Sequence, residues 1–188
     1  MNIHPAFVHF PIAFLFLYAV LELIRCKCAT DKLYWFYLKA TLVIVGTGSM
    51  FVTMMTGEMA EELWKDTAGP MAGTVLAHPE KIDVIETHAM FAGITFLVFL
   101  LIAAAYANEW VKREDRIPSF ARKPGIFASI WAWKIRYSQF VLNTPFVAPT
   151  LALIGLVLLT ILGALGADIV YGADVDPLVG YVHEHFIH

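Results

Sequence analysis

The sequence predicts an all-α integral membrane protein, a bundle of four transmembrane helices that forms a single domain over residues 1–188. Of its residues 59% are hydrophobic and the mean hydropathy is +0.68, which is rare for a soluble domain of this length. Apolar runs long enough to cross a bilayer alternate with polar segments. The basic residues gather in alternate connections, as they do in loops on one side of a membrane.

The first expected span covers residues 5–24, an apolar run that only Glu22 interrupts. A signal peptide carries positive charge ahead of its apolar core, whereas here the charge follows the run, so we expect a retained span. Pro5 suits a first helical turn, and Pro11 costs one early hydrogen bond. His9 would lie one to two turns below the membrane surface, where an ionisable residue suggests a functional site.

The second expected span covers residues 33–56 and opens with aromatic residues that suit the headgroup region, into which Lys39 can snorkel. Small residues recur in it at helical spacing, at Gly46, Ser49 and Thr53, and Gly57 continues this spacing. Such a stripe lets either another helix or a flat ligand approach the backbone closely, and both interpretations stay open.

The second half of the chain supplies the other two spans. Residues 57–86 form a polar connection, and the third span covers 87–107 with His88 in its first turn. Within the long polar stretch that follows, residues 127–142 mix aromatic and basic side chains, which favours a helix in the membrane interface over a simple loop. The fourth span covers 146–167.

The basic residues orient the chain. Eleven of the thirteen Lys and Arg residues lie in the loop after the first span, at the start of the second, or in the loop after the third. By the positive-inside rule, both termini and the 57–86 connection lie outside, in the periplasm if the membrane is a bacterial inner membrane. All seven histidines then fall on that outer side: His4, His9, His78, His88, His183, His185 and His188.

His9 and His88 stand apart because each lies inside a span, near its outer end, on different helices. Two imidazoles facing each other across a four-helix bundle could ligate the iron of a b-type haem. In that case the stripe formed by Gly46, Ser49 and Thr53 makes room for the porphyrin. The alternative is that both histidines only hydrogen-bond between helices.

His4 lies five residues before His9, about 140° away on an ideal helix, so the two would not share a face. We expect His4 at the helix start, where it binds a haem propionate or a metal, or serves as a cap. The tail 181–188 has the composition of a small zinc or copper tract, but a frayed, solvated terminus is the simpler expectation.

Several function classes are excluded. Nucleotide-binding and nucleophile-elbow motifs are absent from the sequence, and its composition does not suggest nucleic acid. We expect an electron-transfer subunit rather than a stand-alone enzyme.

The segment His4-Pro5-x-x-Val8-His9-Phe10-Pro11-Ile12 resembles a family of bacterial four-span membrane proteins, the domain of unknown function 2231. Further matching pieces are Thr56-Gly57, His88 and Gly163-x-x-Gly166-x-x-Ile169-Val170-Tyr171. The resemblance implies a four-helix membrane protein, with members sometimes linked to cytochrome-like modules, and implies no established activity. In this family a His-Gly pair usually follows the tyrosine, whereas Gly172-Ala173 follows Tyr171 here. The role of that histidine would then pass to His183 or His185, or be lost.

These observations favour a membrane subunit that binds heme b through His9 and His88. It would transfer electrons between the quinone pool and a periplasmic partner, such as a cytochrome or another subunit of a respiratory complex. The alternatives are a haem-free structural or assembly subunit, and a metal-handling membrane protein that uses His4, His78 and the tail.

Overall fold

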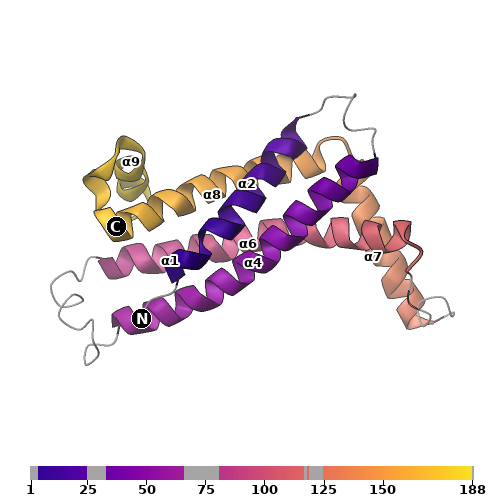
Figure 1. Cartoon of the computed structure of the whole chain (residues 1–188), viewed down its shortest axis with the longest axis horizontal. Coiled ribbons are helices and arrows are strands. Elements are labelled where there is room, and N and C mark those ends of the chain that lie inside the picture. Colours follow the sequence, from indigo (N-terminus) through magenta and orange to yellow (C-terminus); the bar gives the residue numbers. More distant parts are fainter. Residues whose placement is uncertain (1–3, 25–32, 66–80, 117, 119–124, 188) are drawn as a thin grey trace.

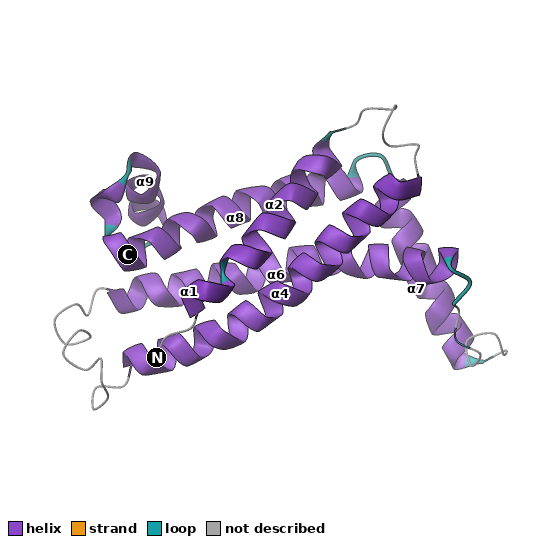
Figure 2. Ribbon diagram, in the orientation of Figure 1, coloured by secondary structure: helices purple, strands orange, loops and turns teal. Residues whose placement is uncertain are grey.

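The computed structural model describes residues 4–24, 33–65, 81–116, 118 and 125–187. Figure 2 shows that these residues are almost entirely helical, which confirms the all-α prediction. In chain order the elements are α1 (His4–Phe7), α2 (His9–Leu23), α4 (Leu33–Lys65), α6 (Lys81–Arg113), α7 (Ile126–Asn143), α8 (Val147–Tyr171), the 3-10 helix η2 (Ala173–Val175) and α9 (Pro177–Phe186).

Four helices form the bundle: α2 packs on α4, α4 on α6, α6 on α8, and α8 on α2 (Figure 1). By length and composition α4, α6 and α8 are each apolar enough to cross a membrane, and α2 is a shorter apolar helix of 15 residues. The core between them is closely packed around the fully buried Leu15, Tyr18 and Phe99. The protein is therefore a helical membrane bundle.

The helices continue beyond the apolar runs expected from the sequence. Helix α4 runs on to Lys65 and α6 begins at Lys81, so both ends of the expected 57–86 connection are helical. Asp83 in the first turn of α6 and the cations Lys112 and Arg113 in its last turn complement the helix dipole. Both helices thus continue past their apolar middle parts into segments that carry charged side chains.

The expectation of a frayed C-terminal tail was wrong, because residues 177–186 form α9 (Figure 1). Asp176 caps this helix by accepting hydrogen bonds from the amides of Leu178 and Val179, and Pro177 occupies its first turn. Val179 and Val182 are then buried in one apolar cluster with residues of α6 and α8. The cap and this apolar pair fold the tail back onto the bundle.

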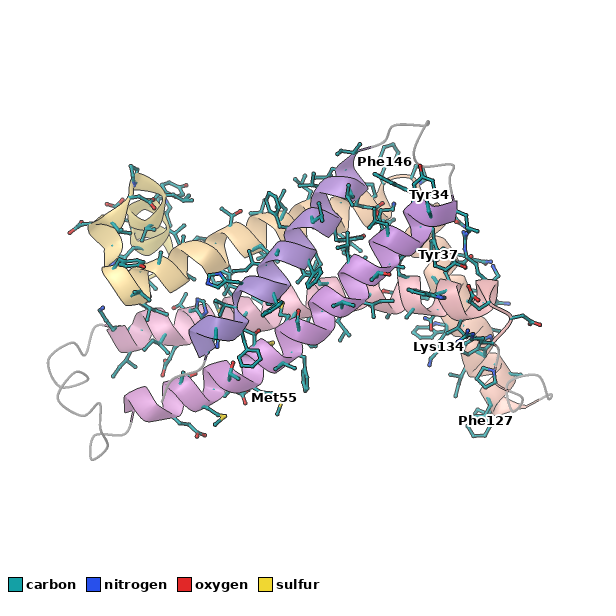
Figure 3. The ribbon with its side chains drawn as sticks, in the orientation of Figure 1. Tyr34, Tyr37, Met55, Phe127, Lys134 and Phe146 are labelled. Carbon is teal, nitrogen blue, oxygen red and sulfur yellow. The ribbon has the colours of Figure 1, made fainter. Side chains whose placement is uncertain are left out.

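Both termini lie at one end of the bundle, and α7 crosses the opposite end (Figure 1). The expected helix over 127–142 is present as α7, Ile126–Asn143. Aromatic side chains including Tyr34, Tyr37 and Phe146 gather at the end where α7 lies (Figure 3). Such aromatic belts mark the level of the lipid headgroups.

Candidate functional site

The candidate site begins at a break in the N-terminal helix. Val8 separates α1 from α2, and Pro11 has no N–H with which to bond the carbonyl of Phe7 four residues earlier. The hydroxyl of Thr53 on α4 lies 3.3 Å from that carbonyl and 3.0 Å from the carbonyl of Ser49, and its single proton is shared between them. The break therefore ties the first residues of the chain to α4.

His4 lies against α4 just beyond this tie. Its Nδ1 lies 3.1 Å from the carbonyl oxygen of Thr53 and 3.1 Å from Oγ1 of Thr56. Because a carbonyl only accepts, Nδ1 carries the proton, and the ring's lone pair is on Nε2. Burial lowers the pKa of His4, against the opposing effect of the hydrogen bond to Thr53, so the neutral ring is favoured.

A glycine makes room for the His4 ring. A Cβ added to Gly57 would lie 3.2 Å from Cε1 of His4, closer than most side chains approach one another. The ring thus packs on the bare backbone of α4. Thr56 and Gly57, which the sequence marked as a motif and, for Gly57, as a member of the small-residue stripe, form part of the surface against which His4 packs.

His88 on α6 is placed similarly, against the neighbouring helix α8. It lies one helical turn after Val84 and three residues before Phe91, both buried. A Cβ on Gly166 of α8 would lie 3.5 Å from its Cε1. The Nδ1 atom of His88 is buried without any hydrogen-bond partner in the described structure. An orphaned nitrogen of this kind costs free energy unless water or a ligand satisfies it.

His88 and His4 lie at the same end of the bundle, within the range over which a charge on one ring acts on the other. His9, in contrast, opens α2 with an exposed side chain. The site thus combines two imidazoles, from α1 and α6, each backed by a glycine of a neighbouring helix.

The remaining histidines occupy other places. His183 on α9 pairs with Asp168 on α8, with Nδ1 and Oδ2 2.6 Å apart, and His185 stacks on Tyr181. His78 and His188 lie outside the described residues. Among the residues that the structure describes, no three His, Cys, Asp or Glu side chains are grouped as a metal ion would need.

The small residues Gly46, Ser49 and Thr53 of α4 make different kinds of contact. A Cβ on Gly46 would lie 2.6 Å from Cδ2 of Leu15, so this glycine admits α2 to close packing. The Ser49 hydroxyl donates to the carbonyl of Gly46 at 2.8 Å. Thr53 alone of the three contacts the histidine site, through Phe7 and His4.

The phenylalanines that flank the histidines in the sequence, Phe7, Phe10 and Phe91, differ in exposure. Phe91 is buried and meets Phe186 of α9 edge to face, with ring centroids 5.0 Å apart. Phe7 and Phe10 are exposed.

A second polar cluster, at the other end of the bundle, was missed by the sequence analysis. Oε2 of Glu22 accepts hydrogen bonds from Tyr106 at 2.8 Å, Lys39 at 2.9 Å and Tyr18 at 3.3 Å. The only sequence signal was a single acid in an apolar run together with a lysine near the start of the next. We name this set the Glu22 cluster.

The fold and these sites define a class of protein, a helical integral membrane protein with a histidine pair at one end of its bundle. The chain belongs to the family described as predicted membrane protein (DUF2231), whose model matches residues 1–177. The match spans α1 to η2 and ends at the first residue of α9. No curated protein and no solved structure matches the chain.

Proposed function

We propose that this protein binds a b-type haem at its histidine end and transfers electrons as one subunit of a larger membrane assembly. The observation that supports this is the pair His4 and His88, two imidazoles from different helices of one bundle, each packed on a glycine. When bound, haem iron supplies one-electron chemistry, and imidazole is a common axial ligand.

The residues present fit such a group in two respects. A metal-ligating histidine usually donates its other ring N–H to a carbonyl or carboxylate, which fixes the ring and its tautomer. The bond from Nδ1 of His4 to the Thr53 carbonyl has this form. The buried, unpartnered Nδ1 of His88 supplies a nitrogen that a ligand would satisfy.

The second axial ligand could come from either N-terminal histidine. The sequence favoured His9 because of its depth in the span. We favour His4 instead, because its ring is half-buried and lies within electrostatic range of His88, whereas His9 is exposed. We therefore propose His88 and His4 as the pair and treat His9 as the competing ligand.

The proposed direction of electron transfer follows from where histidines are found. All of them fall on the outer side of the proposed topology, so a second haem ligated by histidines at the inner end is not available. Quinol in the membrane would donate, and a soluble cytochrome or a neighbouring respiratory subunit would accept outside. The exposed carboxylates of Glu58 and Glu62, on the part of α4 that extends past Gly57, suit a basic partner.

A visible spectrum of the purified protein tests the proposal. A Soret band with sharp α and β bands after reduction is the expected result, and their absence would favour a haem-free structural or assembly subunit.

Four single variants then assign the ligands. His88→Ala and His4→Ala should each abolish the low-spin spectrum or convert it to high spin, and His9→Ala should leave it unchanged. His185→Ala is the matched control, because that ring is exposed and hydrogen-bonds Tyr181 of its own helix. If His9→Ala removes the low-spin form and His4→Ala does not, the His9–His88 pair is the correct one.

A further inference from the structure

Helix α7 is fixed to the bundle along one face. The Tyr137 hydroxyl donates to the carbonyl of Leu101 on α6 at 2.7 Å. Ser138 and Val141 are buried, and Val141 packs with Ala105 of α6 and Ala148 of α8. Helix α7 therefore keeps a defined orientation across the end of the bundle opposite the histidine site (Figure 1).

An exposed apolar row of side chains on α7 adjoins this fixed face and continues it away from the bundle. Its members follow one another at intervals of four, three and seven residues, which places them on one side of a helix. They are Ile126, Ile130, Trp133 and Phe140, and the most exposed of them, Ile126, has 71% of its surface accessible. Tyr137 stacks on Trp133 beside this row, with ring centroids 6.1 Å apart. A surface helix with aromatic and aliphatic side chains of this kind lies with that face in the acyl–headgroup boundary.

The charge of α7 has a single sign. Its only charged residues are Lys134 and Arg136, both exposed, and it contains no Asp or Glu. Neither cation makes an ion pair with any residue in the described part of the chain, whereas Lys112 and Arg113 at the end of α6 both pair with Glu109. Figure 3 shows Lys134 near the bundle and Phe127 at the far end of the helix.

We propose that α7 is a membrane-surface helix that binds anionic phospholipid, with its apolar row in the acyl region and Lys134 and Arg136 on the headgroup phosphates. The bilayer fits better than a second copy of this chain, because two α7 helices packed together would bring four cations close without an acidic partner from α7. It also fits the geometry, since α7 runs across the axis of the spans at one of their ends. Basic residues beside an apolar face add attraction to anionic leaflets.

The test is lipid selectivity of the purified full-length protein. Native mass spectrometry in detergent, with equal amounts of phosphatidylglycerol and phosphatidylcholine, should show that phosphatidylglycerol is retained preferentially. The double variant Lys134→Gln/Arg136→Gln should reduce this preference roughly five-fold for each cation removed. Glutamine keeps the helix propensity close to that of lysine and arginine, so α7 itself should remain folded.

Arg116→Gln is the matched control, because Arg116 is an exposed cation that lies three residues after the end of α6 and outside α7. The preference of the Arg116→Gln variant for phosphatidylglycerol should stay within two-fold of that of the parent protein. The proposal is overturned if the double variant keeps the full preference, or if Arg116→Gln lowers it as much. A dimer that disappears in the double variant would assign the surface to a second copy instead.

Discussion

Nζ of Lys39 on α4 lies 2.9 Å from Oε2 of Glu22 on α2, and both side chains are largely shielded, with 14% and 7% of their surface exposed. Tyr106 of α6 donates to the same carboxylate oxygen at 2.8 Å. One oxygen therefore joins three helices of the bundle. Because the three donors satisfy a charge that is costly at this depth, the cluster fixes how α2, α4 and α6 meet.

The first prediction concerns this ion pair. Lys39→Met leaves the Glu22 carboxylate buried without its cation, and removing one partner of a buried pair costs about 3 kcal/mol or more. The double variant Glu22→Leu/Lys39→Met removes both charges and should recover most of the loss, because an apolar replacement is often neutral. Reversible unfolding in mixed micelles measures both. Equal losses in the single and double variants would show that the charge pair is not the stabilising feature.

The second prediction concerns close packing of α6 and α8. A Cβ on Gly155 would lie 2.6 Å from Cζ of Phe99, whose side chain is fully buried and has no room to move. Gly155→Ala should therefore lower the free energy of unfolding by roughly 1–3 kcal/mol. The matched control is Gly163→Ala on the same helix, where an added Cβ meets nothing within 4 Å. That variant should be neutral or slightly stabilising, as the same unfolding measurement would show.

The helices that depend on local composition were predicted from the sequence. Contacts between residues distant in the chain were not. Apolar runs predicted α2, α4, α6 and α8, because the bilayer leaves few alternatives to a helix. The pairing of Glu22 with Lys39 and Tyr106 depends on three helices meeting at one level, which no local pattern encodes. It was therefore missed.

The same distinction between local pattern and distant contact applies to the histidines. His88 and the N-terminal histidines were identified from their place near the ends of apolar runs. That His4 contacts the Thr53 carbonyl depends on the break at Val8, and thus on how α4 supplies the partner for the Phe7 carbonyl. The tail was mispredicted although the sequence contains a helix-start signal, Asp176 followed by Pro177, just before it.

The third prediction concerns the attachment of α9. The pair of His183 and Asp168 joins α9 to α8, and Asp168 is buried while His183 is 36% exposed. Asp168→Asn weakens this contact, and we expect roughly five-fold faster amide exchange across α9, the effect of losing a partly solvated polar pair. Hydrogen exchange with mass spectrometry measures it. Glu184→Gln, an exposed neighbour, should leave the exchange unchanged, and equal acceleration in both variants would contradict the assigned role.

The fourth prediction concerns topology. From the eleven-to-two distribution of basic residues we expect the Asn108–Thr144 connection in the cytoplasm and the Gly57–Glu86 connection outside. After Lys123, a reporter enzyme that works only in the cytoplasm should be active and one that works only in the periplasm should not. After Gly73, the opposite result is expected. Periplasmic activity at Lys123 would reverse the orientation and place the histidine site on the inner side.

The fifth prediction separates the histidine site from general packing. Gly57→Val places a branched side chain where a Cβ alone would lie 3.2 Å from Cε1 of His4, so the ring must leave its contact with the Thr53 carbonyl. If His4 ligates haem, this variant should lose the low-spin spectrum while the fold persists, as thermal unfolding in detergent would show. Gly93→Val is the control, because Gly93 lies in the neighbouring helix α6 and an added Cβ there meets nothing within 4 Å. An unchanged spectrum in Gly57→Val would remove His4 from the ligand pair and return the choice to His9.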